Sequence, residues 1–176
     1  MLVNNVGLPG PRSPIESVSV DDWIRTIAGS AGAAFHCTKQ VVPQMKARRS
    51  GCIVNISSSS AKTGLPNRTP YVVAKAALEA FSANCARELG PFNIRVNAIR
   101  PGALDNARMR QIIGNRATEA GCAPGAAEAQ FLRYFSMRAL IPLAEVADMA
   151  CFLASDQAMH VTGQCIGVDG NAEWEE

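Results

Sequence analysis

The stretch Gly51-Cys52-Ile53-Val54-Asn55-Ile56-Ser57-Ser58 decides the fold. Its β-branched residues predict a buried strand over 52–56, and a run of four serines marks the end of that strand. Other strands are predicted over 1–6, 94–99 and 164–168. Helical patterns separate them, over 19–47, 71–89, 108–113, 126–135 and 143–153. Strands that alternate with helices imply right-handed crossovers and a parallel sheet.

The composition is typical of one globular domain. Of the 176 residues, 48% are hydrophobic and 18% are charged, and the formal net charge of +2 is too small to favour a nucleic-acid partner. No apolar run reaches the ~18 residues of a membrane span, and no signal peptide opens the chain. The six cysteines form no Cys-x-x-Cys pair, so neither a disulfide framework nor a zinc site is expected. We therefore expect a soluble cytoplasmic protein without a membrane partner.

Tyr71 and Lys75 stand one helical turn apart at the start of an apolar-periodic segment. This spacing places a phenol and an ammonium on one helix face, where the cation favours the ionised form of the phenol. Such a tyrosine can act as a general acid or base. Ser58, thirteen residues upstream, can supply the second hydroxyl that holds a carbonyl oxygen.

Two alternatives weigh against this interpretation. An isolated Tyr-x-x-x-Lys pair is more often a solvated pair of neighbours on a surface helix. The chain also has a second tyrosine, Tyr134, with Arg138 four residues further on. However, Gly121 stands where the upstream serine of Tyr134 would be, so Tyr71 is the better candidate.

Five motifs resemble, in order and spacing, those of the short-chain dehydrogenase/reductase family, over essentially the whole chain. Leu2–Gly7 is similar to the family's Asn-Asn-Ala-Gly motif, and Gly51–Ser58 is similar to its strand before the catalytic serine. Tyr71–Lys75 resembles the family's Tyr-x-x-x-Lys helix, and Asn93–Gly102 resembles its Pro-Gly turn with the strand before it. Thr162–Gln164 with Val168–Gly170 resembles its closing strand. The resemblance implies the C-terminal part of a Rossmann-like, doubly wound parallel α/β sheet, with about four strands and flanking helices.

The family's opening segment has no counterpart in these residues. Family members begin with a strand, a turn of the form Thr-Gly-x-x-x-Gly-x-Gly, and a helix whose N-terminus receives the cofactor pyrophosphate. The nearest glycine pairs, Gly7 with Gly10 and Gly29 with Gly32, lack the third glycine. By the resemblance, residues 1–176 form a single incomplete domain that begins at the family's fourth strand, with roughly the first third missing.

That expectation has consequences for the chain on its own. The acidic or basic residue that would choose between NAD and NADP is missing with the opening segment. A sheet edge and one sheet face would also be exposed. We therefore expect the 176-residue chain to bind neither dinucleotide appreciably and to be oligomeric or poorly soluble.

The resemblance assigns catalytic roles to three residues. Tyr71 would exchange a proton with the substrate oxygen while a hydride moves between the substrate carbon and the nicotinamide of NAD or NADP. Lys75 would favour the ionised tyrosine and hydrogen-bond the nicotinamide ribose, and Ser58 would hold the carbonyl oxygen. The other serines of the run 57–60 would cap or turn the backbone.

One further catalytic position departs from the family pattern. The family commonly has an asparagine seven residues after a tryptophan, where it anchors a water linked to the lysine. Counting from Trp23 gives Ser30, which is shorter and lacks the two amide donors, so a weakened relay through Ser30 is expected. Cofactor contacts are expected from Asn4, Val6, Gly7, Tyr71, Lys75, Pro101, Gly102 and Asn106, the last at the place of a family threonine.

The region 103–141 would form the substrate lid in family members. Its apolar side chains fit a pocket wall, core packing or a subunit contact equally well: Met109, Ile112, Ile113, Phe131, Tyr134, Phe135 and Met137. The sequence therefore does not identify the substrate.

The main functional hypothesis is an NAD(P)-dependent oxidoreductase that interconverts a secondary alcohol and a ketone. Relatives pair through the helices that follow Ser19 and Tyr71, which implies a homodimer or a homotetramer. The alternative is a truncated, catalytically silent relative that acts as an interaction or assembly module. A non-redox relative, in which serine and tyrosine work alone, is disfavoured because such relatives typically replace the lysine with arginine, and here it is Lys75.

Overall fold

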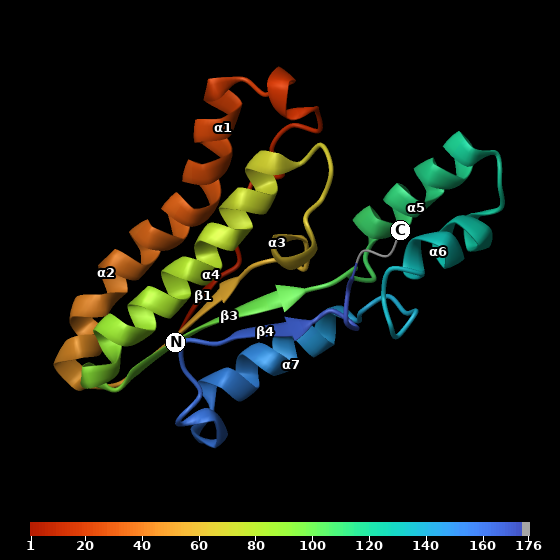
Figure 1. Ribbon diagram of the computed structural model, residues 1–176. Helices are drawn as coiled ribbons and strands as arrows, with labels where there is room; N and C mark the ends of the chain where they lie inside the picture. The colour runs from red at the N-terminus through yellow and green to blue at the C-terminus, as the bar shows by residue number, and fades with distance from the viewer. Residues whose placement is uncertain (174–176) are drawn as a thin grey trace.

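The computed structural model describes residues 1–173, which are organised around one parallel sheet. Its strands are β1 (Leu2–Asn4), β2 (Gly51–Ile56), β3 (Ile94–Pro101) and β4 (Cys165–Val168), side by side in this order (Figure 1). Asn4 pairs with Asn55, and Pro101 pairs with Val168. The carboxyl ends of the strands therefore lie at one edge of the sheet. The predicted α/β class with a four-stranded parallel sheet is confirmed.

Helices connect the strands, and several of them begin and end at local sequence signals. Ser19 caps the first helix by accepting a hydrogen bond from the Asp22 N–H at 3.0 Å. Arg49 and Gly121 adopt left-handed backbone conformations where two helices end. The α-helices are α1 (Val20–Ile27), α2 (Ala33–Arg48), α3 (Ser60–Thr63), α4 (Thr69–Leu89), α5 (Ala107–Ala120), α6 (Pro124–Leu132) and α7 (Leu143–Ala154). Short helical turns are η1 (Ile15–Ser17), η2 (Ala28–Gly32), η3 (Gly90–Phe92) and η4 (Asp156–Ala158).

Helices cover both faces of the sheet. On one face, Met45 of α2 and Leu89 of α4 pack against Ile53. On the other face, Leu153 of α7 packs against Val54. Ile53 and Val54 are neighbours on β2 and point to opposite sides of the sheet, so α7 lies opposite α2 and α4 (Figure 1).

This arrangement corrects one expectation about the connections. All three crossovers advance in the same direction across the sheet, but the third one passes over the opposite face. The β3-to-β4 crossover therefore has the opposite hand to the other two, and the expectation of right-handed crossovers throughout is wrong. The rule describes a helix that packs straight back onto its sheet. Here α5 and α6 first carry the chain beyond the sheet, which frees α7 to return on the other side.

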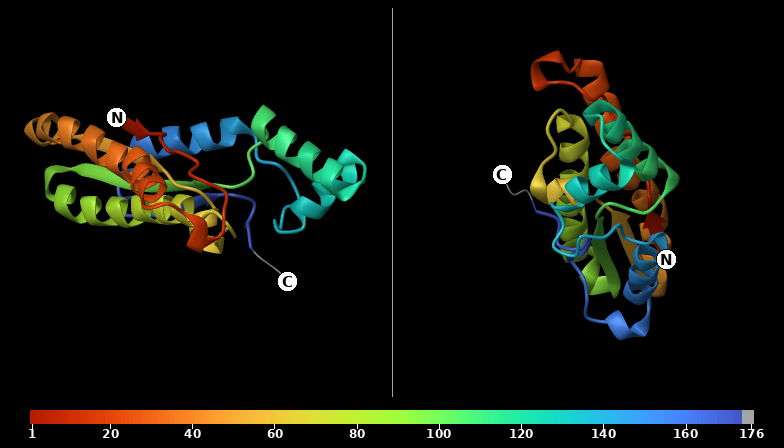
Figure 2. Two further views of the ribbon diagram at one scale, coloured as in Figure 1. Left: turned by 90° about the horizontal axis from the view of Figure 1, so that it is seen from above. Right: turned by 90° about the vertical axis from the view of Figure 1, so that its right-hand side faces the viewer.

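The helices α5 and α6 lie beyond the carboxyl ends of β3 and β4 (Figures 1 and 2). Ile113 of α5 and Ala127 of α6 are buried against one another, together with Met109 and Phe131. Core packing thus accounts for most apolar residues of this region, whereas Met137 remains 72% exposed. The helix predicted over 108–113 continues to residue 120.

The segment predicted as one helix over 19–47 is interrupted by the π-helical turn η2. Its residues are small, and Leu8 packs so closely on Gly29 that a Cβ there would lie 2.5 Å from Leu8 Cδ1. Turns of this kind recur at functional sites. None of the helices within residues 1–173 combines the length and the apolar character that a membrane span requires.

Candidate active site

The candidate catalytic residues come from elements that end or begin at the carboxyl edge of the sheet. Ser58 follows β2, Tyr71 lies in the first turn of α4, and the Pro-Gly turn at 101–102 closes β3. The backbone N–H of Ser59 donates to the carbonyl of Pro101 at 2.9 Å, so the serine run and the Pro-Gly turn are in direct contact. The structure therefore brings these segments together, as their positions in the sequence predict.

Lys75 is fixed in the interior of this site. The residue is only 6% exposed, and its ammonium donates to the carbonyl of Val6 at 3.0 Å and to that of Ile56 at 2.8 Å. Burial lowers the pKa of Lys75 to about 8. The ammonium thus links the loop after β1 to the end of β2, one helical turn from Tyr71.

Tyr71 is half-buried between two cations. Lys75 Nζ lies 5.9 Å from the centroid of its ring, and the Arg68 guanidinium carbon lies 5.1 Å from it. Both distances are within the range of cation–π attraction. Within residues 1–173, the Tyr71 hydroxyl makes no hydrogen bond to the protein, so it is available to a ligand.

The Ser58 hydroxyl is engaged with its own loop. Ser58 Oγ and Ser60 Oγ lie 2.7 Å apart, and the Ser60 N–H donates to Ser58 Oγ at 3.3 Å. The two hydroxyls are hydrogen-bonded to one another, so a rotation of the Ser60 hydroxyl would free Ser58 Oγ for another partner. A hydroxyl can also donate to one partner and accept from another. Ser58 can therefore hold a substrate oxygen without a change in the fold.

Ser30 lies close to Lys75, as its predicted role in a relay requires. It is fully buried in η2, and its hydroxyl accepts a hydrogen bond from the Leu8 N–H at 3.2 Å. A Cβ placed on Gly7 would lie 3.1 Å from Lys75 Nζ and 3.5 Å from Ser30 Oγ. Both side chains therefore border the same point on the backbone of Gly7, and a Cβ there would be tightly packed and would displace the Lys75 ammonium slightly.

Two of the predicted cofactor residues have structural duties instead. Asn4 is 2% exposed, and its side-chain amide donates to Thr38 Oγ1 at 3.3 Å and to Asn55 Oδ1 at 2.7 Å. The pleat of β1 turns this side chain into the core, so a cofactor contact of Asn4, which stays a prediction, would have to use its backbone. Asn106 caps α5 by accepting from the Met109 N–H at 2.9 Å, which leaves its amide group as the possible donor.

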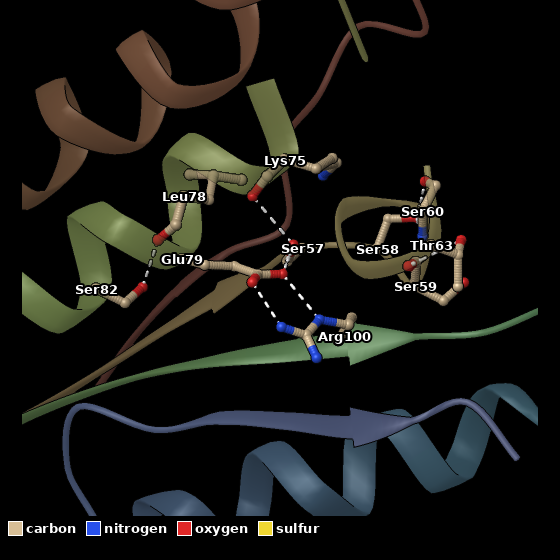
Figure 3. Close-up of polar contacts among 10 residues, drawn as sticks. All are labelled: Ser57, Ser58, Ser59, Ser60, Thr63, Lys75, Leu78, Glu79, Ser82 and Arg100. Atoms are coloured by element: carbon tan, nitrogen blue, oxygen red, sulfur yellow. Dashed lines mark hydrogen bonds and ion pairs between the residues drawn. The ribbon is translucent and has the colours of Figure 1, made fainter. Parts of the chain in front are cut away.

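Sequence reasoning missed an ionic cluster behind the site (Figure 3). Glu79 of α4 and Arg100 of β3 are paired by two contacts, Oε1 to Nε at 3.0 Å and Oε2 to Nη2 at 2.6 Å. Ser57 Oγ lies 2.7 Å from Glu79 Oε1 and 3.0 Å from the carbonyl of Lys75. Glu79 is one turn beyond Lys75 on the same helix face, which is the one signal that could have suggested its position.

The charges in this cluster stabilise one another. Burial raises the pKa of Glu79, but the hydrogen bonds from Arg100 and Ser57 outweigh it, so the pKa of this carboxyl is below its usual range. The hydrogen bond that Arg100 donates to Glu79 raises the pKa of Arg100. Burial, with the nearby Glu79 carboxylate, raises the pKa of the Cys165 thiol to about 12. The cluster therefore holds a firmly ionised pair beside a thiol that stays protonated.

Two cavities lie away from these residues. One, of about 340 Å³, is formed between α5 and α6 and includes Arg116 and Tyr134. The other, of about 700 Å³, lies between α7 and the end of β4 and includes Met149 and Asp169. Neither is lined by Ser58 or Tyr71. Tyr134, the rival tyrosine of the sequence, lies beyond the end of α6 and packs against a cluster that includes Phe135.

Comparison with known proteins gives the same family along the whole chain. The family model described as "Enoyl-(Acyl carrier protein) reductase" matches residues 1–171. Cyclopentanol dehydrogenase from Comamonas testosteroni is 35% identical over 169 residues, which are 96% of this chain and 64% of that protein. Trans-4-hydroxycyclohexanecarboxylate dehydrogenase from Sinomonas cyclohexanicum is 34% identical over 170 residues, 97% of this chain and 59% of that protein. The chain thus spans less than two thirds of the length of these relatives.

Solved structures agree with the relatives. An NAD⁺-bound xylitol dehydrogenase superposes with a TM-score of 0.86 at 30% identity, covering 96% of this chain and 67% of the other. YwfH, an NADPH-dependent reductase involved in bacilysin biosynthesis, superposes with a TM-score of 0.87 at 29% identity, covering 99% and 67%. The fold is therefore Rossmann-like. The chain belongs to the short-chain dehydrogenase/reductase family.

Proposed function

We propose that the protein is an NAD(P)-dependent oxidoreductase that interconverts a secondary alcohol and a ketone by hydride transfer at a Ser58-Tyr71-Lys75 site. The observation that carries this proposal is the position of Lys75. Its buried ammonium is held by the carbonyls of Val6 and Ile56, one helical turn from a tyrosine whose hydroxyl is available at the carboxyl edge of the sheet.

The residues present fit the nicotinamide half of a cofactor. Gly7 is exposed, and any side chain on it would crowd Lys75 Nζ, so the missing Cβ leaves the approach to the ammonium open. Gly7, Tyr71 and Lys75 would hold this half, with Gly102 and the Asn106 amide on the β3 side. The nicotinamide ring supplies the carbon that accepts or donates the hydride. One of the superposed structures is bound to NAD⁺ and the other is an NADPH-dependent reductase. We therefore propose NAD or NADP as the cofactor of this chain.

Each catalytic residue then has one task. In alcohol oxidation, Tyr71 takes the hydroxyl proton of the substrate while the hydride leaves the adjacent carbon. In ketone reduction, the same phenol returns a proton to the oxygen that becomes the alcohol. Lys75 stabilises the ionised phenol, and Ser58 donates a hydrogen bond to the substrate oxygen so that it faces Tyr71.

Assembly and location are the remaining parts of this proposal. Exposed apolar side chains lie on α1 and α2, where Ile24 is 57% and Phe35 is 47% exposed, and Val73 of α4 is 37% exposed. These surfaces support a homodimer or homotetramer. A cytoplasmic location stays a prediction. Light scattering of the purified protein would report the assembly.

Turnover with a defined panel tests the proposal. The protein, expressed from its whole reading frame, would be given NAD or NADP with cyclopentanol, cyclohexanol and trans-4-hydroxycyclohexanecarboxylate. Reduction of the nicotinamide would be followed by its absorbance, and ketone formation by mass spectrometry. We expect oxidation of at least one ring alcohol with one cofactor. A folded protein that binds neither cofactor would instead support the alternative, a catalytically silent assembly module.

A further inference from the structure

Arg68 precedes α4 and lies over the Tyr71 ring. Two further arginines are close enough to Arg68 for their charges to act on it, Arg12 of the loop after β1 and Arg108 in the first turn of α5. None of the three is needed to explain the Ser58-Tyr71-Lys75 site, so this group of arginines calls for its own explanation.

Direct contacts hold the two loops together beside Tyr71. Arg68 Nη2 donates to the carbonyl of Pro9 at 2.8 Å, and the Ser13 N–H donates to the carbonyl of Asn67 at 3.0 Å. These contacts place Arg12, which precedes Ser13, next to the loop that carries Arg68. The Arg68 guanidinium itself lies over the Tyr71 ring, 5.1 Å from its centroid.

The two loops also contain polar atoms without a protein partner. Within residues 1–173, Arg68 Nε and Ser13 Oγ are buried and make no hydrogen bond. Buried donors are nearly always paired in native proteins, and exceptions point to water, an ion or a ligand. These two unpaired atoms lie in the same pair of loops, beside the same tyrosine.

No ion pair among residues 1–173 joins Arg12, Arg68 or Arg108 to an acidic side chain. Burial lowers the pKa of Arg68, the nearby Tyr71 opposes this effect, and repulsion from Arg108 and Arg12 lowers the pKa further. Two further cations beside a half-buried guanidinium destabilise its charged form, and an anion bound among them would relieve this repulsion.

A substrate is the ligand that must come to this place. Tyr71 can exchange a proton only with a molecule that touches its hydroxyl, and Arg68 lies over the same ring. We propose that Arg68, together with Arg12 and Arg108, binds an anionic group of the alcohol or ketone substrate, a carboxylate or a phosphate. The guanidinium group presents paired donors that match the oxygens of either anion. This inference rests on the proposed function of Tyr71.

Alcohols that share one ring but differ in charge test the inference. The measured quantity is the ratio of kcat/KM for 4-hydroxycyclohexanecarboxylate to kcat/KM for cyclohexanol, with 4-hydroxycyclohexyl phosphate as the phosphate-bearing counterpart. We expect this ratio to exceed one for the carboxylate or the phosphate, and the larger of the two identifies the anion. If kcat/KM for cyclohexanol equals or exceeds that for both anionic alcohols, the proposal is overturned.

Substitutions assign the effect to the arginines. Arg68→Gln is expected to lower the ratio about 10-fold to 100-fold, which is typical for loss of a charge-assisted contact. Arg108→Gln, at an exposed position, is expected to lower it several-fold without affecting folding, and Arg108→Lys is expected to retain most of it. Arg87→Gln is the matched control, an exposed arginine near the other end of α4. A ratio that neither Arg68→Gln nor Arg108→Gln changes would refute the assignment.

A binding measurement separates this inference from the proposed function. Cyclohexanecarboxylate cannot be oxidised at an alcohol, so calorimetry with this compound reports the anion site without turnover. We expect binding that weakens with added salt and with Arg68→Gln but not with Arg87→Gln. If no alcohol is oxidised but this pattern appears, the proposed function fails and the anion site stands. If alcohols are oxidised but cyclohexanecarboxylate binding is the same in all variants, the anion site fails alone.

Discussion

Glu79 on α4 and Arg100 on β3 form a two-point ion pair in which both side chains are largely enclosed, 18% and 19% exposed. Glu79 lies one turn after Lys75, and Arg100 immediately precedes Pro101. Ser57, which also contacts Glu79, immediately precedes Ser58. Each member of the cluster is thus close in sequence to a candidate site residue on a different element, so the pair ties these elements to one another.

Loss of this pair should destabilise the protein. Glu79→Gln leaves Arg100 largely buried without a counter-charge, and we expect the free energy of unfolding to fall by about 3 kcal/mol at neutral pH. Because the pKa of Glu79 is lowered in the folded state, its stabilisation is present above the ordinary glutamate pKa of about 4.3. It is lost as the pH falls through the lower folded value.

Urea denaturation at several pH values measures this difference. The difference in unfolding free energy between wild type and Glu79→Gln should become smaller below pH of about 4. Glu88→Gln, an exposed position on the same helix, should change the unfolding free energy by less than about 0.5 kcal/mol. A gap that is independent of pH would show that packing, rather than charge, connects Glu79 to Arg100.

Lys75 should also make the unfolding free energy rise with pH, but over an alkaline range. Burial lowers its pKa to about 8 in the folded state, so between this value and the ordinary lysine pKa the unfolded chain binds more protons. The free energy of unfolding of wild type, relative to Lys75→Met, should therefore rise by about 2 kcal/mol from pH of about 7.5 to about 9.5. Parallel denaturation curves of the two proteins test this. A constant or falling difference across this range would mean that the ammonium is not desolvated.

Gly7 should tolerate no side chain without a loss of function. In Gly7→Ala the new Cβ would lie 3.1 Å from Lys75 Nζ, so the ammonium must move from its place beside the site. We expect kcat/KM to fall about 10-fold, equivalent to a loss of about 1.4 kcal/mol in transition-state stabilisation. Gly114→Ala is the control, because nothing lies near its Cβ and alanine favours helix, so it should raise the unfolding free energy by about 0.5–1 kcal/mol. Full activity of Gly7→Ala would place the ligand elsewhere.

Local sequence patterns predicted the strands well because each rests on a short run of apolar residues, as in β2, and the order of elements then dictated a parallel sheet. The π-helical turn at η2 escaped prediction, since its small residues fit an ordinary helix equally well. The hand of the third crossover depends on where α5 and α6 pack, which no local pattern encodes.

In the candidate site, too, only local features were predictable. The sequence could place Ser58, Tyr71 and Lys75 at the ends of a strand and a helix because these positions depend on local patterns. The pair of Glu79 with Arg100 forms only when α4 packs on β3, so spacing alone could not predict it. The motif likewise did not tell which way the Asn4 side chain points, which the pleat of a three-residue strand decides.

The central claim, that Tyr71 is the acid/base of an alcohol–ketone conversion, is tested most directly by removing one oxygen atom. In the protein expressed from its whole reading frame, Tyr71→Phe should lower kcat/KM for the best ring alcohol by about 10²-fold to 10⁴-fold, with cofactor binding close to that of wild type. Tyr134→Phe, which changes the other tyrosine of the chain, should retain activity within about 2-fold. Substantial turnover by a folded Tyr71→Phe protein would contradict the account.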